Sequence, residues 1–107
     1  MWIHKTTAKV EQQNKDKLIA MLSTEKVFDL FREHAGFQAY YLVDKLSDPD
    51  EMASITIWDT QEDGEDLYAS PEYREVLSGA VPLLVGKPEM ETFTVKVECR
   101  TLISSLN

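Results

Sequence analysis

The sequence predicts one α+β domain in which a four-stranded antiparallel sheet carries helices on one face. Three observations support this fold class. Four short segments combine β-branched, aromatic and alternating apolar residues, as strands do. Between the first two segments, and again between the last two, apolar residues recur at helical spacing. The length of 107 residues suits a single domain spanning residues 1–107.

The composition is that of an ordinary globular protein, with 43% hydrophobic and 28% charged residues. The 19 acidic and 11 basic residues give a net charge of −8, which disfavours binding to nucleic acid or to anionic lipid. One cysteine cannot form an internal disulfide, and the sequence has neither a membrane-spanning apolar run nor a signal-peptide pattern. We therefore expect a cytoplasmic protein without a nucleic-acid or membrane partner.

The first half of the chain predicts a strand over residues 2–10 and then two helices. Asn14 is expected to cap the first helix. The apolar clusters at 18–22 and 27–31 lie on helix faces about half a turn apart, so a break at Ser23–Glu25 is needed for both to face one core. Gly36 is expected as the residue just beyond the end of the second helix.

The second half begins with a predicted hairpin, in which strands 37–44 and 51–59 flank a turn at 45–50. Thr60 is the expected cap of the next helix, and Ser70-Pro71 restarts it. The remaining segments are a helical stripe interrupted by Gly79 and Pro82, a loop at 86–88, a strand at 89–98 and a tail at 99–107.

This order, βαββαβ with each helical unit in two parts, is that of ferredoxin-like folds. The second strand is expected to place Tyr40 and Leu42 opposite Phe37, Tyr41 and Val43. Apolar residues on both faces indicate that both faces of the sheet are covered, one by the helices and the other by a second copy of the sheet. We expect a homodimer, in which Leu102, Ile103 and Leu106 of the tail reach across the partner.

Four segments carry a resemblance to a known family: Gly36–Tyr41 (GFQAYY), Asp48-Pro49-Asp50, Ile55–Glu62 (ITIWDTQE) and Leu67–Tyr73 (LYASPEY). Through them the sequence resembles the antibiotic biosynthesis monooxygenase-type domains of the dimeric α/β-barrel superfamily. These motifs specify the fold well and the chemistry poorly, because that superfamily hosts several activities.

The resemblance implies cofactor-independent oxygenation of a small aromatic or quinol-type molecule. In that chemistry the substrate loses a proton and its anion passes an electron to O₂, inside a dry cavity between sheet and helices. No cofactor is expected, and the absence of paired His or Cys motifs predicts no local metal site. The heme-degrading branch is disfavoured because Leu67 and Leu77 stand where it has a Trp and a His, and residues 2–10 contain no Asn.

The candidate catalytic residues are His4, Trp58 and Tyr41. His4 could serve as the base or face the partner subunit. Trp58 could pack in the core or donate its indole N–H to a substrate oxygen, and Tyr41 could lie in the core or in the cavity wall. The candidate substrate-binding residues are Tyr68, Tyr73, Phe28 and Phe31, with the hydroxyls of both tyrosines expected in water at the helix edge.

The alternative function is a non-catalytic ligand-binding or assembly domain of the same fold, since no sharp polar constellation is visible in the sequence. An isomerase or lyase would need an acid–base pair that the sequence does not locate.

Overall fold

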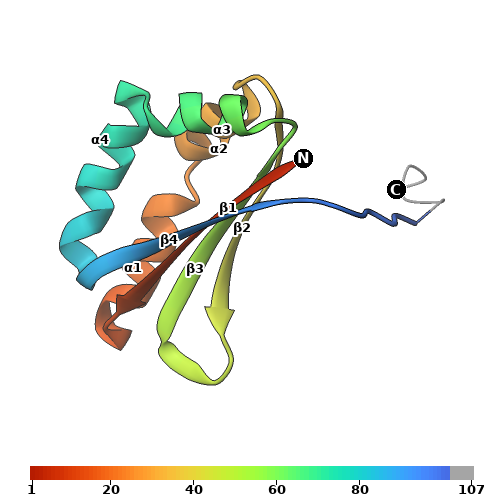
Figure 1. Cartoon of the computed structure of the whole chain (residues 1–107). Coiled ribbons are helices and arrows are strands. Elements are labelled where there is room, and N and C mark those ends of the chain that lie inside the picture. Colours follow the sequence, from red (N-terminus) through yellow and green to blue (C-terminus); the bar gives the residue numbers. More distant parts are fainter. Residues whose placement is uncertain (102–107) are drawn as a thin grey trace.

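The structure, a computed structural model, describes residues 1–101 and confirms the predicted α+β class. Helices cover one face of a single sheet, and the last strand continues past the N-terminus as an extended arm (Figure 1). The elements in chain order are β1 (Trp2–Val10), α1 (Gln12–Leu22), α2 (Glu25–Arg32), β2 (Phe37–Lys45), β3 (Asp48–Trp58), α3 (Gln61–Tyr68), α4 (Pro71–Ala80), the 3₁₀ helix η1 (Val81–Leu83) and β4 (Leu84–Thr94).

The sheet has the strand order β2-β3-β1-β4, and every neighbouring pair is antiparallel. This is the arrangement predicted from the βαββαβ order. No helix within residues 1–101 is long and apolar enough to cross a membrane. The expected partner contacts of Leu102, Ile103 and Leu106 lie outside the described residues.

The helix break predicted at Ser23–Glu25 is confirmed. Thr24 caps α2 by accepting a hydrogen bond from the Val27 N–H at 3.2 Å. Thr60 caps α3 in the same way through the Asp63 N–H, and Ser70 caps α4 with Pro71 in its first turn. Each cap satisfies one backbone N–H that the helix itself leaves unpaired, which is why the chain restarts helices at these residues.

Two predicted helix ends were wrong. Helix α1 begins at Gln12 with Glu11 as its cap residue, so Asn14 lies within the first turn and not before it. Helix α2 ends at Arg32, and Gly36 lies beyond its C-cap, in the turn that enters β2. Gly36 still requires glycine there, because its φ is 78° and a β-carbon would meet the Asp63 carboxylate.

Three predicted strand details also differ. The loop expected at 86–88 is part of β4, where Gly86 at φ 76° coincides with a register shift against β1. The hairpin turn is shorter than residues 45–50, because Lys45 already pairs with Asp48. Phe37 was expected opposite Tyr40, but a register shift between Phe37 and Ala39 places both aromatic rings in the core beneath the helices.

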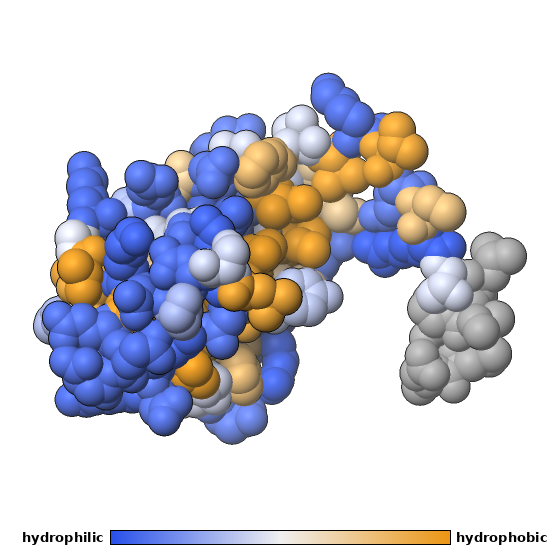
Figure 2. Space-filling model, turned by 90° about the horizontal axis from the view of Figure 1, so that it is seen from below, coloured by the Kyte–Doolittle hydropathy of each residue, from blue (hydrophilic) through white to orange (hydrophobic). Residues whose placement is uncertain are grey.

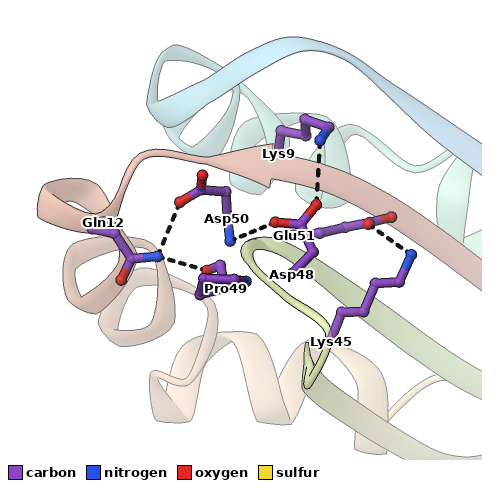
Figure 3. A network of polar contacts seen from close by, with 7 residues as sticks. All are labelled: Lys9, Gln12, Lys45, Asp48, Pro49, Asp50 and Glu51. Atoms are coloured by element: carbon purple, nitrogen blue, oxygen red, sulfur yellow. Dashed lines mark hydrogen bonds and ion pairs between the residues drawn. The ribbon is translucent and has the colours of Figure 1, made fainter.

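Polar contacts connect the β2–β3 hairpin to the start of α1 (Figure 3). The Gln12 side-chain amide donates to the Pro49 carbonyl at 2.7 Å and to the Asp50 carboxylate at 3.0 Å. Asp48 accepts from the Asp50 backbone N–H and from Lys9, at 3.1 and 3.4 Å. The hairpin is therefore fixed to β1 and α1 at the end of the sheet far from the termini.

Two buried apolar clusters fill the space between sheet and helices. One is centred on Trp2, Trp58 and Leu67, and the other on Val10, Leu18 and Met52. Gly64 of α3 lies against the first cluster, where a β-carbon would be 2.2 Å from Cζ3 of Trp2 and 3.1 Å from Cδ1 of Trp58. Glycine at this position therefore permits the close approach of α3 to the sheet.

The opposite face of the sheet, called the outer face here, is uncovered in one chain. Strand alternation places there the side chains of Ile3, Tyr41, Val43, Ile55, Ile57 and Phe93. Tyr41 is 54% exposed and Phe93 is 46% exposed. Figure 2 shows apolar surface in the hollow between the body of the domain and the C-terminal arm. The arm, residues 95–101, is joined to the N-terminus just before β1 by the Val95 N–H, which donates to the Met1 carbonyl at 3.0 Å.

The Gly64 contact predicts a difference between two helical glycines. Gly64→Ala should lower the free energy of unfolding by about 1–3 kcal/mol, because the new methyl group overlaps a buried indole. Gly79→Ala is the matched control in α4: its β-carbon meets only the Met21 side chain, at 3.4 Å, and alanine favours helix by up to about 1 kcal/mol. Urea unfolding of both variants measures the difference, and equal destabilisation would contradict the close approach.

Candidate functional site

A cavity of about 90 Å³ lies between the sheet and the helices, where the family resemblance implied one. In the part of the chain that the structure describes, none of the lining residues carries a charged side chain. Its apolar walls include Phe31, Leu42 and Val76, and hydroxyl groups reach it from both layers. The hydroxyl-bearing residues that line it are Thr6, Tyr40, Ser54, Thr56, Tyr68 and Tyr73.

A chain of hydrogen bonds runs from the core to the cavity wall. The Trp58 indole N–H donates to Thr56 Oγ1 at 2.9 Å, and Thr56 Oγ1 lies 2.5 Å from the Tyr68 hydroxyl. Trp58 and Thr56 are both fully buried. The Trp58 indole N–H is therefore occupied by Thr56 and is not free for a substrate oxygen. The Tyr68 hydroxyl, which was expected in water from the sequence, is hydrogen-bonded inside the protein instead.

His4 is buried beside these hydrogen-bonded side chains, and its ring stacks on that of Tyr68 with 4.0 Å between the ring centroids. Burial lowers the pKa of His4 below its ordinary value, so the imidazole is neutral at pH 7. Its Nδ1 is buried and has no hydrogen-bond partner within residues 1–101. His4 itself does not line the cavity, and it contacts the lining residue Tyr68.

Three tyrosines form the aromatic wall. Tyr73 meets Tyr68 edge-on, with centroids 4.7 Å apart. Burial raises the pKa of Tyr68 and of Tyr40 to about 12, and it raises that of Tyr73 further with contributions from the other two phenols. All three are therefore protonated donors at neutral pH. Tyr40 already donates to the Leu22 carbonyl at 3.0 Å.

The structure brings together five of the seven candidate residues: His4, Trp58, Tyr68, Tyr73 and Phe31. Tyr41 lies on the outer face, away from the cavity. Phe28 is also outside the cavity lining, since its ring lies edge-on to Tyr40 and beneath the Arg32 guanidinium at 5.4 Å.

Thr56 was missed by the sequence reasoning, although a signal was present. Thr56 lies between Ile55 and Ile57, so its side chain points to the opposite face of the strand, the face that also carries Trp58. A polar residue on this core-facing side is the signal. Within residues 1–101 no three His, Cys, Asp or Glu side chains lie close enough together to hold a metal ion.

Comparisons with known proteins agree with this architecture. The sequence matches the family described as antibiotic biosynthesis monooxygenase over residues 5–78. No curated protein matches it. Among solved structures, SnoaB, a cofactor-independent oxygenase from Streptomyces nogalater, superposes with a TM-score of 0.75 at 15% identity, covering 94% of this chain and 95% of the other.

Two further structures show the same fold. Rv0793 from Mycobacterium tuberculosis gives a TM-score of 0.76 at 14% identity, covering 92% of this chain and 98% of its own. A conserved protein from Methanosarcina mazei Go1 gives 0.77 at 12% identity, with 90% and 94% covered. At such identities the likeness concerns the fold, and the family follows from the match over residues 5–78: this chain belongs to the antibiotic biosynthesis monooxygenase family.

Proposed function

We propose that the protein is a cofactor-independent monooxygenase that oxidises a small aromatic or quinol-type molecule with O₂ in the cavity between sheet and helices. The observation that supports this most directly is the cavity itself, whose lining within residues 1–101 has uncharged side chains and includes tyrosines and threonines. Such a site removes water from a phenolic substrate and still offers donors to the oxygen that becomes negative.

The reaction balances without a further reductant. A CH₂ group activated by a neighbouring phenol reacts with O₂ to give C=O and H₂O, and the substrate supplies all the electrons. The substrate first loses a proton, its anion gives one electron to O₂, and the two radicals combine before water leaves. The protein needs to accept the proton and to stabilise the anion.

Thr56 and Tyr68 are placed to stabilise that anion, because their hydroxyls meet at the cavity wall. His4 is the candidate proton acceptor, since its imidazole is neutral and its Nδ1 is unpaired within residues 1–101. Phe31 and Tyr73 would hold the substrate ring.

The second candidate function is a ligand-binding domain without turnover. A specific observation favours it: no side chain with a pKa near neutrality lines the cavity, and His4 is covered by Tyr68. In that case the tyrosines and Thr56 would bind a ligand and no proton would be transferred.

Oxygen uptake in metal-free buffer separates the two candidates. With a panel of quinols and anthrones we expect O₂ consumption that depends on the protein, with one product carbonyl formed per O₂ consumed. His4→Gln should lower the rate by about 10²–10⁴-fold, as loss of a general base does, and leave binding of the same compounds unchanged. Binding without any O₂ uptake across the panel would instead support the ligand-binding function.

We also propose that two chains associate through their outer faces. Tyr41, Val43 and Phe93 leave a broad apolar surface exposed in one chain, and a monomeric domain seldom leaves such a surface in water. A second copy of the same face covers it with identical chemistry. The exposed, unpaired Cys99 supports a reducing, cytoplasmic setting for this assembly.

Light scattering at micromolar concentration tests this association. The wild-type protein should have twice the 12.2 kDa mass of one chain. Phe93→Glu should shift it toward the monomer, because the new charge would be buried in the interface. Leu46→Glu, at the exposed hairpin turn, is the matched control and should remain dimeric. A monomeric wild-type protein would contradict the proposal.

A further inference from the structure

The hydrogen-bonded side chains of Trp58, Thr56 and Tyr68 carry one donor hydrogen more than the number of hydrogen bonds that they make with one another. Its three polar groups are an indole N–H and two hydroxyls, which together carry three hydrogens. Two bonds join them: Trp58 donates to Thr56, and one of the two hydroxyls donates to the other. One hydroxyl hydrogen therefore remains, whichever of Thr56 and Tyr68 is the donor between them.

This remaining hydrogen has no acceptor within residues 1–101. Within residues 1–101 the side chains of Thr56 and Tyr68 make no hydrogen bonds other than the one between them and the one from Trp58 to Thr56. Thr56 is 1% exposed, so bulk water does not readily reach it. Both residues line the cavity, and an unused donor on the wall of an apolar cavity is a binding point for an acceptor atom of a ligand.

The lining also restricts the charge of that ligand. Among residues 1–101, no Lys, Arg or His side chain lines the cavity to pair with a carboxylate. An ionised ligand would lose its hydration without a counter-charge, which costs far more than one hydrogen bond returns. Tyr68 is a protonated donor at neutral pH, and burial, which raises its pKa to about 12, makes its anion still less favourable.

We propose that Thr56 and Tyr68 together form the binding point for the carbonyl or phenolic oxygen of a small, neutral aromatic ligand, and that the cavity rejects carboxylates. This deepens the proposed function by assigning the recognition of the substrate oxygen. The volume of about 90 Å³ is below the roughly 150 Å³ of a cavity that holds benzene, so the lining residues must move apart to admit even one ring, and a larger ligand is disfavoured.

Three single-ring probes of similar size test the proposal by binding alone. Acetophenone has an acceptor oxygen, ethylbenzene lacks one, and benzoate is an anion. Their dissociation constants are measured by NMR titration of the ¹⁵N-labelled protein. Benzoate should bind at least tenfold more weakly than acetophenone. The quantity compared between variants is the ratio of the ethylbenzene constant to the acetophenone constant, which isolates the hydrogen bond.

The hydrogen count makes an unusual prediction for the variants. Tyr68→Phe alone should keep the ratio, because Thr56 then has a free hydrogen of its own. Adding Thr56→Val to Tyr68→Phe removes both hydroxyls at nearly constant shape and should lower the ratio about tenfold, as the loss of one hydrogen bond does. The single variant is thus the matched control for the double variant.

A second measurement does not depend on the variants folding. The infrared carbonyl stretch of acetophenone, ¹³C-labelled at its carbonyl, should lie lower when bound to the wild-type protein than in an alkane solvent, because the carbonyl accepts a hydrogen bond. An unshifted stretch, an unchanged ratio in the double variant, benzoate binding as tight as acetophenone binding, or no binding of acetophenone at millimolar concentration would each overturn the proposal. Binding as expected without any O₂ uptake would leave it standing and remove only the monooxygenase function.

Discussion

The arrangement of the site depends on the contact between Gly64 and the two indoles beneath it. Because Gly64 has no side chain, α3 can lie against Trp2 and Trp58 at a distance that a β-carbon would forbid. Tyr68 is one helical turn further along α3 and so faces the same way. Thr56 precedes Trp58 by two residues on β3 and shares its face. One close approach therefore brings the two hydroxyls together.

For its chemistry, the site therefore offers hydrogen-bond donors from uncharged side chains. The tyrosines are protonated at neutral pH and burial raises their pKa further, while burial lowers the pKa of His4 and favours its neutral form. A site of this kind can stabilise a developing phenolate by hydrogen bonds from a low-dielectric wall. The chain belongs to the antibiotic biosynthesis monooxygenase family, whose model covers residues 5–78.

The sequence predicted the layers and most of the elements because their signals are local. Helix caps such as Thr60 and Ser70 depend only on the first turn of their own helix. The helix break is likewise visible locally, because the apolar clusters at 18–22 and 27–31 lie on different helix faces. Phe37 and residues 86–88 were misjudged because strand register depends on the neighbouring strand, which the local pattern does not contain. The Thr56–Tyr68 contact joins two elements and therefore needed the structure, as did the placement of Tyr41 on the outer face.

A crystal structure of the wild-type protein soaked with acetophenone would show whether a ligand oxygen meets the Thr56 and Tyr68 hydroxyls in the cavity. We expect the ring between Phe31 and Tyr73, with the carbonyl oxygen within about 3 Å of Thr56 Oγ1 or the Tyr68 hydroxyl. A ligand bound on the outer face near Tyr41, or seated in the cavity with its carbonyl directed away from both hydroxyls, would contradict this expectation.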